Sequence, residues 1–116
     1  MKILGIEFDI DITDAEVIER LEKGQQIVEK QSEELEEKRS NLTLAEGIKQ
    51  ECKIAKDFLD YVIGEGTSKE LFGEKNSLAK CMEALEDLNN CIESQQKDFQ
   101  NIINKYSPDR IKRWIS

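Results

Sequence analysis

The chain has 116 residues, with 25 Asp and Glu against 17 Lys and Arg, no His, three Cys and one Pro. This length suits a single domain with one core, so residues 1–116 are predicted to form one helical domain. Charged residues make up 36% of the chain, and this share with almost no Pro is typical of long amphipathic helices. The composition disfavours a thick-cored α/β enzyme.

The charge is distributed unevenly along the chain. Residues 1–40 hold 12 acidic and six basic residues, whereas residues 107–116 hold one acidic and three basic residues. An acidic body repels phosphate backbones, so we expect no nucleic-acid binding. The apolar runs are far shorter than the roughly 20 residues of a membrane span, and the start lacks a signal-peptide stretch. We therefore expect a cytoplasmic protein with no membrane partner.

The N-terminal residues 1–12 are predicted to form a short strand or hairpin ribbon. From residue 4 to residue 12 every even position is apolar, and from residue 5 every odd position is Gly or acidic, which is the pattern of a half-buried strand. A tight turn at Leu4-Gly5 would pair residues 1–3 with residues 6–10. An isolated two-stranded ribbon is marginal in water, so this one must pack on the helices or pair with another chain. Its candidate partner-binding residues are Leu4, Ile6 and Phe8.

Three main helices are predicted, over residues 14–39, 44–63 and 77–106, with one further helical turn at 67–72. Each of the first two helices and the short turn begins with the sequence of a capping box, at Thr13, Thr43 and Thr67. The first helix has a narrow apolar stripe, because Gln25 and Ser32 occupy its companion seam positions. The second has a broad stripe that includes Leu59.

The last helix carries an apolar stripe in steps of three and four residues over about 30 residues, a coiled-coil-like pattern. We expect it to pair with the second helix as a hairpin through the connection at 64–76, with Leu59 and Leu85 in the core. The predicted fold class is mainly α (α+β): a short N-terminal strand or hairpin followed by a three-helix antiparallel bundle with a long C-terminal helix. The sequence leaves open whether the first helix docks on the bundle.

The sequence carries no pattern of catalytic, cofactor-binding or metal-binding residues. Without His, neither a Ser-His-Asp nor a Cys-His arrangement exists, and Cys52, Cys81 and Cys91 are too widely spaced for a metal clip. The three Cys are predicted to be reduced core thiols. The many paired carboxylates follow from composition, so we expect a protein that is not an enzyme and needs no cofactor.

The C-terminal residues 107–116 form a basic tail. Arg110, Lys112, Arg113 and Trp114 interleave positive charge with an aromatic ring, which suits contact with the acidic groove of a partner. A frayed terminus explains the same residues equally well.

Three parts of the sequence resemble a family of small proteins from the tail-morphogenesis modules of phages and prophages of Firmicutes. They are the opening from Met1 to Ala15, the middle with Phe58-Leu59-Asp60, Gly64-Glu65-Gly66-Thr67 and Leu71-Phe72-Gly73, and the end from Lys105 to Arg110. The resemblance implies a tail assembly chaperone-like protein in the host bacterial cytoplasm, with a phage tail or tape-measure protein as its partner. It implies no catalytic residues.

Three functional hypotheses follow. The leading one is a phage structural-assembly protein that acts by protein–protein contact, because exposed helical seams and net charge suit a chaperone for an apolar helical client. The first alternative is a phage-encoded inhibitor of a host defence protein, which would imitate phosphate charge. The second is a self-associating helical adaptor, a homo-oligomer with no separate client. The sequence does not decide the oligomeric state or the partner.

Overall fold

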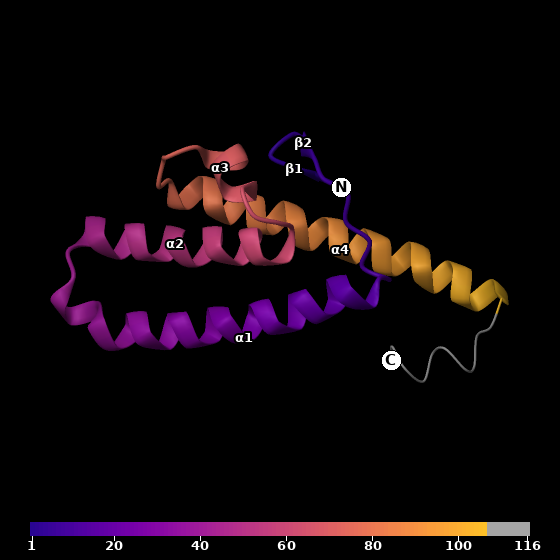
Figure 1. Ribbon diagram of the computed structural model, residues 1–116, viewed down its shortest axis with the longest axis horizontal. Helices are drawn as coiled ribbons and strands as arrows, with labels where there is room; N and C mark the ends of the chain where they lie inside the picture. Colours follow the sequence, from indigo (N-terminus) through magenta and orange to yellow (C-terminus); the bar gives the residue numbers. More distant parts are fainter. Residues whose placement is uncertain (107–116) are drawn as a thin grey trace.

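The computed structural model describes residues 1–106 and shows a mainly helical chain behind a small N-terminal hairpin (Figure 1). The elements in chain order are β1 (Lys2–Ile3), β2 (Ile6–Glu7), α1 (Ala15–Lys38), the 3₁₀ turn η1 (Arg39–Asn41), α2 (Leu44–Val62), α3 (Thr67–Phe72) and α4 (Leu78–Tyr106). The predicted mainly α class is confirmed, and the three main helices agree with the predicted ranges to within one residue at each end. The basic tail, with Arg110, Lys112, Arg113 and Trp114, lies outside the described residues.

The N-terminal hairpin turns at Leu4-Gly5, as predicted. Its two strands are antiparallel, with Ile3 opposite Ile6, and both turn residues have positive φ, 50° for Leu4 and 82° for Gly5. Positive φ at both central residues is the mark of the type I′ turn, whose twist matches that of the two strands. The ribbon packs against α4 of its own chain. The fully buried residue is Ile3, however, and the backbone pairing ends with the hydrogen bond from the Phe8 N–H to the Met1 carbonyl at 2.7 Å rather than continuing to residue 10.

Polar side chains of α4 replace the missing strand partners of the N-terminal segment. Asp87 accepts a hydrogen bond from the backbone N–H of Leu4 at 3.0 Å. Gln95 accepts one from the N–H of Ile12 at 2.9 Å and donates one to the carbonyl of Ile10 at 2.8 Å. Buried backbone groups need such partners, and these bonds let residues 9–12 leave the strand ladder and lie along the helix. They also explain why a polar Gln occupies the apolar stripe of α4.

The capping box predicted at Thr43 is present at the start of α2. The Thr43 hydroxyl accepts from the N–H of Glu46 at 3.2 Å, and the Glu46 carboxylate accepts from the N–H of Thr43 at 3.1 Å. This backbone hydrogen bond lowers the pKa of Glu46 below its usual value, because it favours the ionised carboxylate. The box holds α2 at its turn from η1.

The other two predicted capping boxes are wrong. At α1 the N-cap is Asp14, which accepts from the N–H of Glu16 at 2.8 Å, while Thr13 bonds to Asp11 instead. At α3 the Thr67 hydroxyl donates to the carbonyl of Gly64 at 2.6 Å, and the cap residue Gly66 has φ 93° and no capping side chain. In both places the threonine hydroxyl that was predicted to cap the helix instead donates a hydrogen bond to an oxygen atom of a residue two or three positions earlier in the chain.

The core lies between α2, α4 and the hairpin. One buried cluster joins Ile3, Leu59, Ala84 and Leu88, and a second joins Cys52, Ala55 and Cys81. In these clusters Cys52 meets Cys81 and Leu59 meets Ala84 and Leu88, so residue numbers rise together along the two helices. The helices α2 and α4 therefore run in the same direction, and the predicted antiparallel hairpin between them is wrong. The connection at 63–77, which contains α3, is long enough to carry the chain back along α2.

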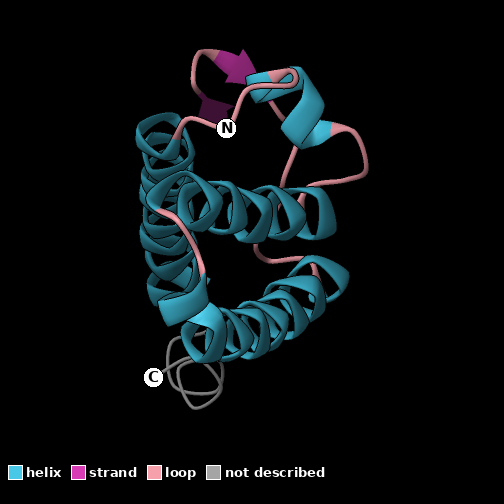
Figure 2. Cartoon of the chain, turned by 90° about the vertical axis from the view of Figure 1, so that its left-hand side faces the viewer, coloured by secondary structure: helices cyan, strands magenta, loops and turns pink. Residues whose placement is uncertain are grey.

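Helix α1 docks antiparallel beside α2, which settles the question that the sequence left open. The close approach occurs at Gly24, where a Cβ atom would lie 3.1 Å from Phe58 Cε1 and 3.2 Å from Val62 Cγ2. Figures 1 and 2 show the strands and α3 on one side of the α2–α4 pair and α1 on the opposite side. Helix α2 is thus the middle helix, with α1 and α4 on its two flanks.

Candidate functional site

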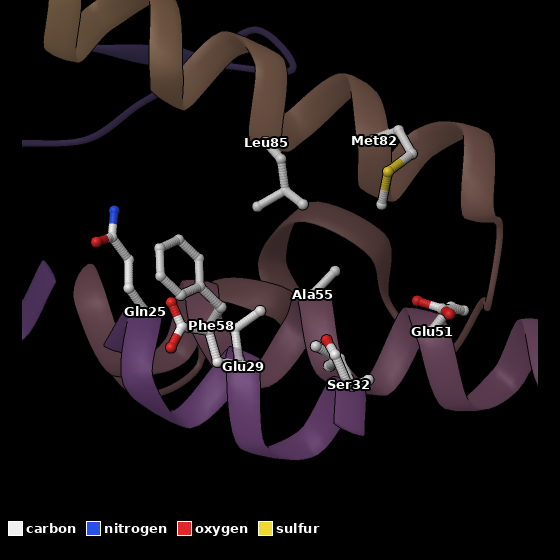
Figure 3. A pocket seen from close by; sticks show the side chains of 10 residues that line it. Gln25, Glu29, Ser32, Glu51, Ala55, Phe58, Met82 and Leu85 are labelled. Atoms are coloured by element: carbon white, nitrogen blue, oxygen red, sulfur yellow. The ribbon is translucent and has the colours of Figure 1, made fainter. Parts of the chain in front are cut away.

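An open groove runs between α1 and α4, with α2 as its floor (Figure 3). One part of it has a volume of about 380 Å³ and is continued towards the end of α2 by a second depression of about 460 Å³ that shares Gln25, Phe58 and Leu85. Helix α1 contributes Leu21, Gln25, Val28, Glu29 and Ser32, α2 contributes Glu51, Ile54, Ala55 and Phe58, and α4 contributes Met82, Leu85, Glu86, Leu88, Asn89 and Ile92. We call this surface the α1–α4 groove.

The groove exists because α1 has too few apolar side chains to close against α4. Along its inner face Gln25 and Ser32 alternate with Leu21 and Val28, so the stripe that faces α4 is broken by polar groups. Closing α1 onto α4 would bury these polar groups without partners, which is costly. On this side of α4, Met82 and Leu85 therefore stay accessible, and Met82 is 45% exposed.

The floor of the groove is apolar and its rim is acidic. Figure 3 shows Met82 and Leu85 on α4 across the opening from Gln25, Glu29 and Ser32 on α1, with Ala55 and Phe58 between them. The charged residues that line it are Glu29, Glu51 and Glu86, and none of the described lining residues is Lys or Arg. Such a surface suits a ligand with an apolar stripe and positive charge beside it.

The thiols of the chain lie away from the opening of this groove. Cys52 and Cys81 are fully buried where α2 meets α4, and Cys91 donates a long hydrogen bond from Sγ to the carbonyl of Lys2 at 3.7 Å. Burial, with a smaller contribution from the Cys52 thiol, raises the pKa of Cys81 to about 11. A thiol that keeps its proton at neutral pH is a poor nucleophile, so Cys81 acts as a small core residue. Residues 1–106 contain no group of three Cys, Asp or Glu arranged to hold a metal ion.

Of the predicted partner-binding residues, the structure describes Leu4, Ile6 and Phe8, and it does not bring them into this groove. Leu4 and Phe8 pack against the core cluster of their own chain, and Ile6 lies half-buried opposite Ile3. The groove residues were missed because the periodicity placed Leu85 in the core. The available signal was the pair of polar seam positions, Gln25 and Ser32, which already indicated that the first helix could not cover its neighbours completely.

Comparisons with known proteins place the chain in one family. Among residues 1–106 no helix is long and apolar enough to cross a membrane. No curated protein and no solved structure matches the chain significantly. Residues 4–115, nearly the whole chain, match the family of unknown function DUF6673, and the chain belongs to that family.

Proposed function

We propose that this protein is a phage or prophage structural-assembly factor of the tail assembly chaperone type, which acts by protein–protein contact in the host bacterial cytoplasm. The observation that carries the proposal is the α1–α4 groove, an open apolar surface with an acidic rim. The resemblance of the sequence to proteins of tail-morphogenesis modules supports the assignment to phage assembly.

The occupant that fits the groove is an amphipathic helix of a tail or tape-measure protein, with an apolar stripe flanked by Lys or Arg. Its apolar side chains would cover Phe58, Met82 and Leu85, and its basic residues would face Glu29 and Glu51. Helix-in-groove recognition relies on such anchors, and the apolar contacts supply the affinity while the charges set the orientation. The net charge of −8 keeps a protein with an open apolar groove in solution.

The test is an affinity pull-down from induced lysogen and uninduced host lysates, followed by mass spectrometry. Wild type is compared with Met82→Glu, which places a charge in the groove, and with Ile27→Glu, a matched control outside the groove at a similarly exposed position. We expect wild type and Ile27→Glu to recover tail or tape-measure proteins after induction only, and Met82→Glu to lose them. Equal recovery by both variants would show that the groove is not the binding surface.

A second candidate function is inhibition of a host protein, favoured by the acidic surface of α1. Glu33, Glu34, Glu36 and Glu37 are all exposed in the last turns of that helix. A row of carboxylates can occupy a basic nucleic-acid groove by imitating phosphate charge. Recovery of a host protein from uninduced lysate, lost at moderate salt, would favour this candidate, because groove binding through apolar contacts survives such salt.

A further inference from the structure

We propose that the basic tail of one copy, residues 107–116, docks in the α1–α4 groove of a second copy, so that the protein assembles head to tail. The inference rests on the proposed function only in that both use the same groove; the tail and the client helix then compete for it. Three observations support it: the charge of the two surfaces, the apolar pattern of the tail and the reach of the chain.

The charges of the two surfaces are complementary. The groove presents Glu29, Glu51 and Glu86, with no Lys or Arg among its described lining residues. The tail has three bases, Arg110, Lys112 and Arg113, and one acid, Asp109, in an otherwise acidic chain. Opposite charges of this kind speed encounter and fix the orientation of the bound segment. The tail thus has an excess of positive charge, although the whole chain has a net charge of −8.

The apolar residues of the tail match the apolar lining of the groove. Ile111, Trp114 and Ile115 stand at positions i, i+3 and i+4, the spacing that places side chains on one face of a helix. The groove offers Ala55 and Phe58 on its floor and Met82 and Leu85 on α4. Trp and Arg are the residue types that most often carry binding energy at interfaces, and the tail holds both.

The reach of the tail restricts it to the near end of the groove of its own chain. Along α4, Tyr106 is 24 residues beyond Met82, which corresponds to about 36 Å of helix. Trp114 is eight residues beyond Tyr106, and eight residues span at most about 29 Å when fully extended. The tail of the same chain therefore cannot place Trp114 beside Met82, although it can reach Ile92 at the near end of the groove. A second copy has no such limit.

This contact is heterologous, because the tail of one copy meets the groove of another rather than itself. Each copy then offers one tail and one groove, and successive copies form a ring or an open chain. Such a contact has a property that a symmetric dimer lacks. A copy with a defective tail and a copy with a defective groove can still form one joint between them, although neither can pair with itself.

The experiment is sedimentation velocity of the purified full-length protein and two variants. Trp114→Ala/Arg113→Glu disables the tail, and Glu51→Lys reverses a charge on an exposed groove residue. We expect the sedimentation coefficient of wild type to rise with concentration over the micromolar to millimolar range. Each variant alone should weaken self-association about tenfold or more, as the loss of one strong interface residue does. The equimolar mixture of the variants should form a dimer that grows no further.

Three results would overturn the inference. The first is a wild-type protein that stays monomeric over the whole concentration range, as it would if the tail folded back on its own chain. The second is self-association that persists in both variants. The third is an equimolar mixture of the two variants that sediments as monomers. Ile27→Glu serves as the surface control and should associate like wild type, and circular dichroism of each variant checks the fold. Sedimentation uses purified protein alone, so a negative result would contradict self-association and would not bear on the proposed function. The proposed function is tested independently, by the loss of client capture in Met82→Glu.

Discussion

The contact between α1 and α2 at Gly24 allows a prediction in which two opposing effects of known size compete. In Gly24→Ala the new methyl group would lie 3.1 Å from Phe58 Cε1, 3.2 Å from Val62 Cγ2 and 3.3 Å from Phe58 Cδ1. Replacing Gly by Ala in a helix interior stabilises the helix by about 0.8–1 kcal/mol. Overpacking a filled contact costs about 1–3 kcal/mol. We expect a net loss of about 1 kcal/mol.

Gly47 provides the matched control. It lies in α2, and a Cβ atom built there would meet nothing within 4 Å. Gly47→Ala should therefore show only the propensity gain, about 0.8–1 kcal/mol. The difference between the two variants removes the propensity contribution and measures the packing cost at Gly24, about 1–3 kcal/mol.

The assay is urea unfolding followed by far-ultraviolet circular dichroism, with unfolding free energies from linear extrapolation. Equal stabilisation by the two substitutions would refute the packing of α1 on Phe58 and Val62. A double-mutant cycle sharpens the test, because in a Phe58→Leu background the cost of Gly24→Ala should fall. An unchanged cost in that background would show that the ring is not what the methyl group meets.

Three further predictions concern stability. Leu59→Ala should lower the unfolding free energy by about 2–5 kcal/mol, because Leu59 is fully buried. Leu85→Ala should lower it by only about 1–2 kcal/mol, because Leu85 borders the open groove. Equal losses in urea unfolding would contradict this division between core and groove. Thr43→Ala should lose about 1 kcal/mol and Thr13→Ala clearly less, because only Thr43 caps its helix, and the same unfolding assay distinguishes them. The raised pKa of Cys81 means that the unfolded chain releases this proton near pH 9 and the folded chain near pH 11, so its contribution to stability is complete below pH 9 and is lost as the pH rises to about 11. Wild type should therefore lose more stability over that interval than Cys81→Ala, and parallel pH curves would refute the assignment.

The local features of this protein were predictable because short-range forces decide them. The turn at Leu4-Gly5, the capping box at Thr43 and the helix ends to within one residue all follow from a few neighbouring residues. Where a nearby side chain offered a competing hydrogen bond, as Asp11 does for Thr13, the local pattern was misleading. Asp11 lies only two residues from Thr13, so this error also concerns local interactions: the pattern does not show which of two nearby hydrogen bonds the Thr13 hydroxyl makes.

The mainly helical class, the ends of each long helix and the apolar face of each could be predicted without the structure, because the 3.6-residue period of the apolar residues indicates these properties directly. Three features are visible only in the folded chain: α4 runs parallel to α2, Gln95 supports the N-terminal backbone, and Leu85 borders a groove. Periodicity identifies an apolar face but neither the neighbour that covers it nor the direction of that neighbour. Those depend on how far the connection at 63–77 carries the chain and on whether α1 has enough apolar surface to cover α4. The candidate site lies where that coverage is incomplete.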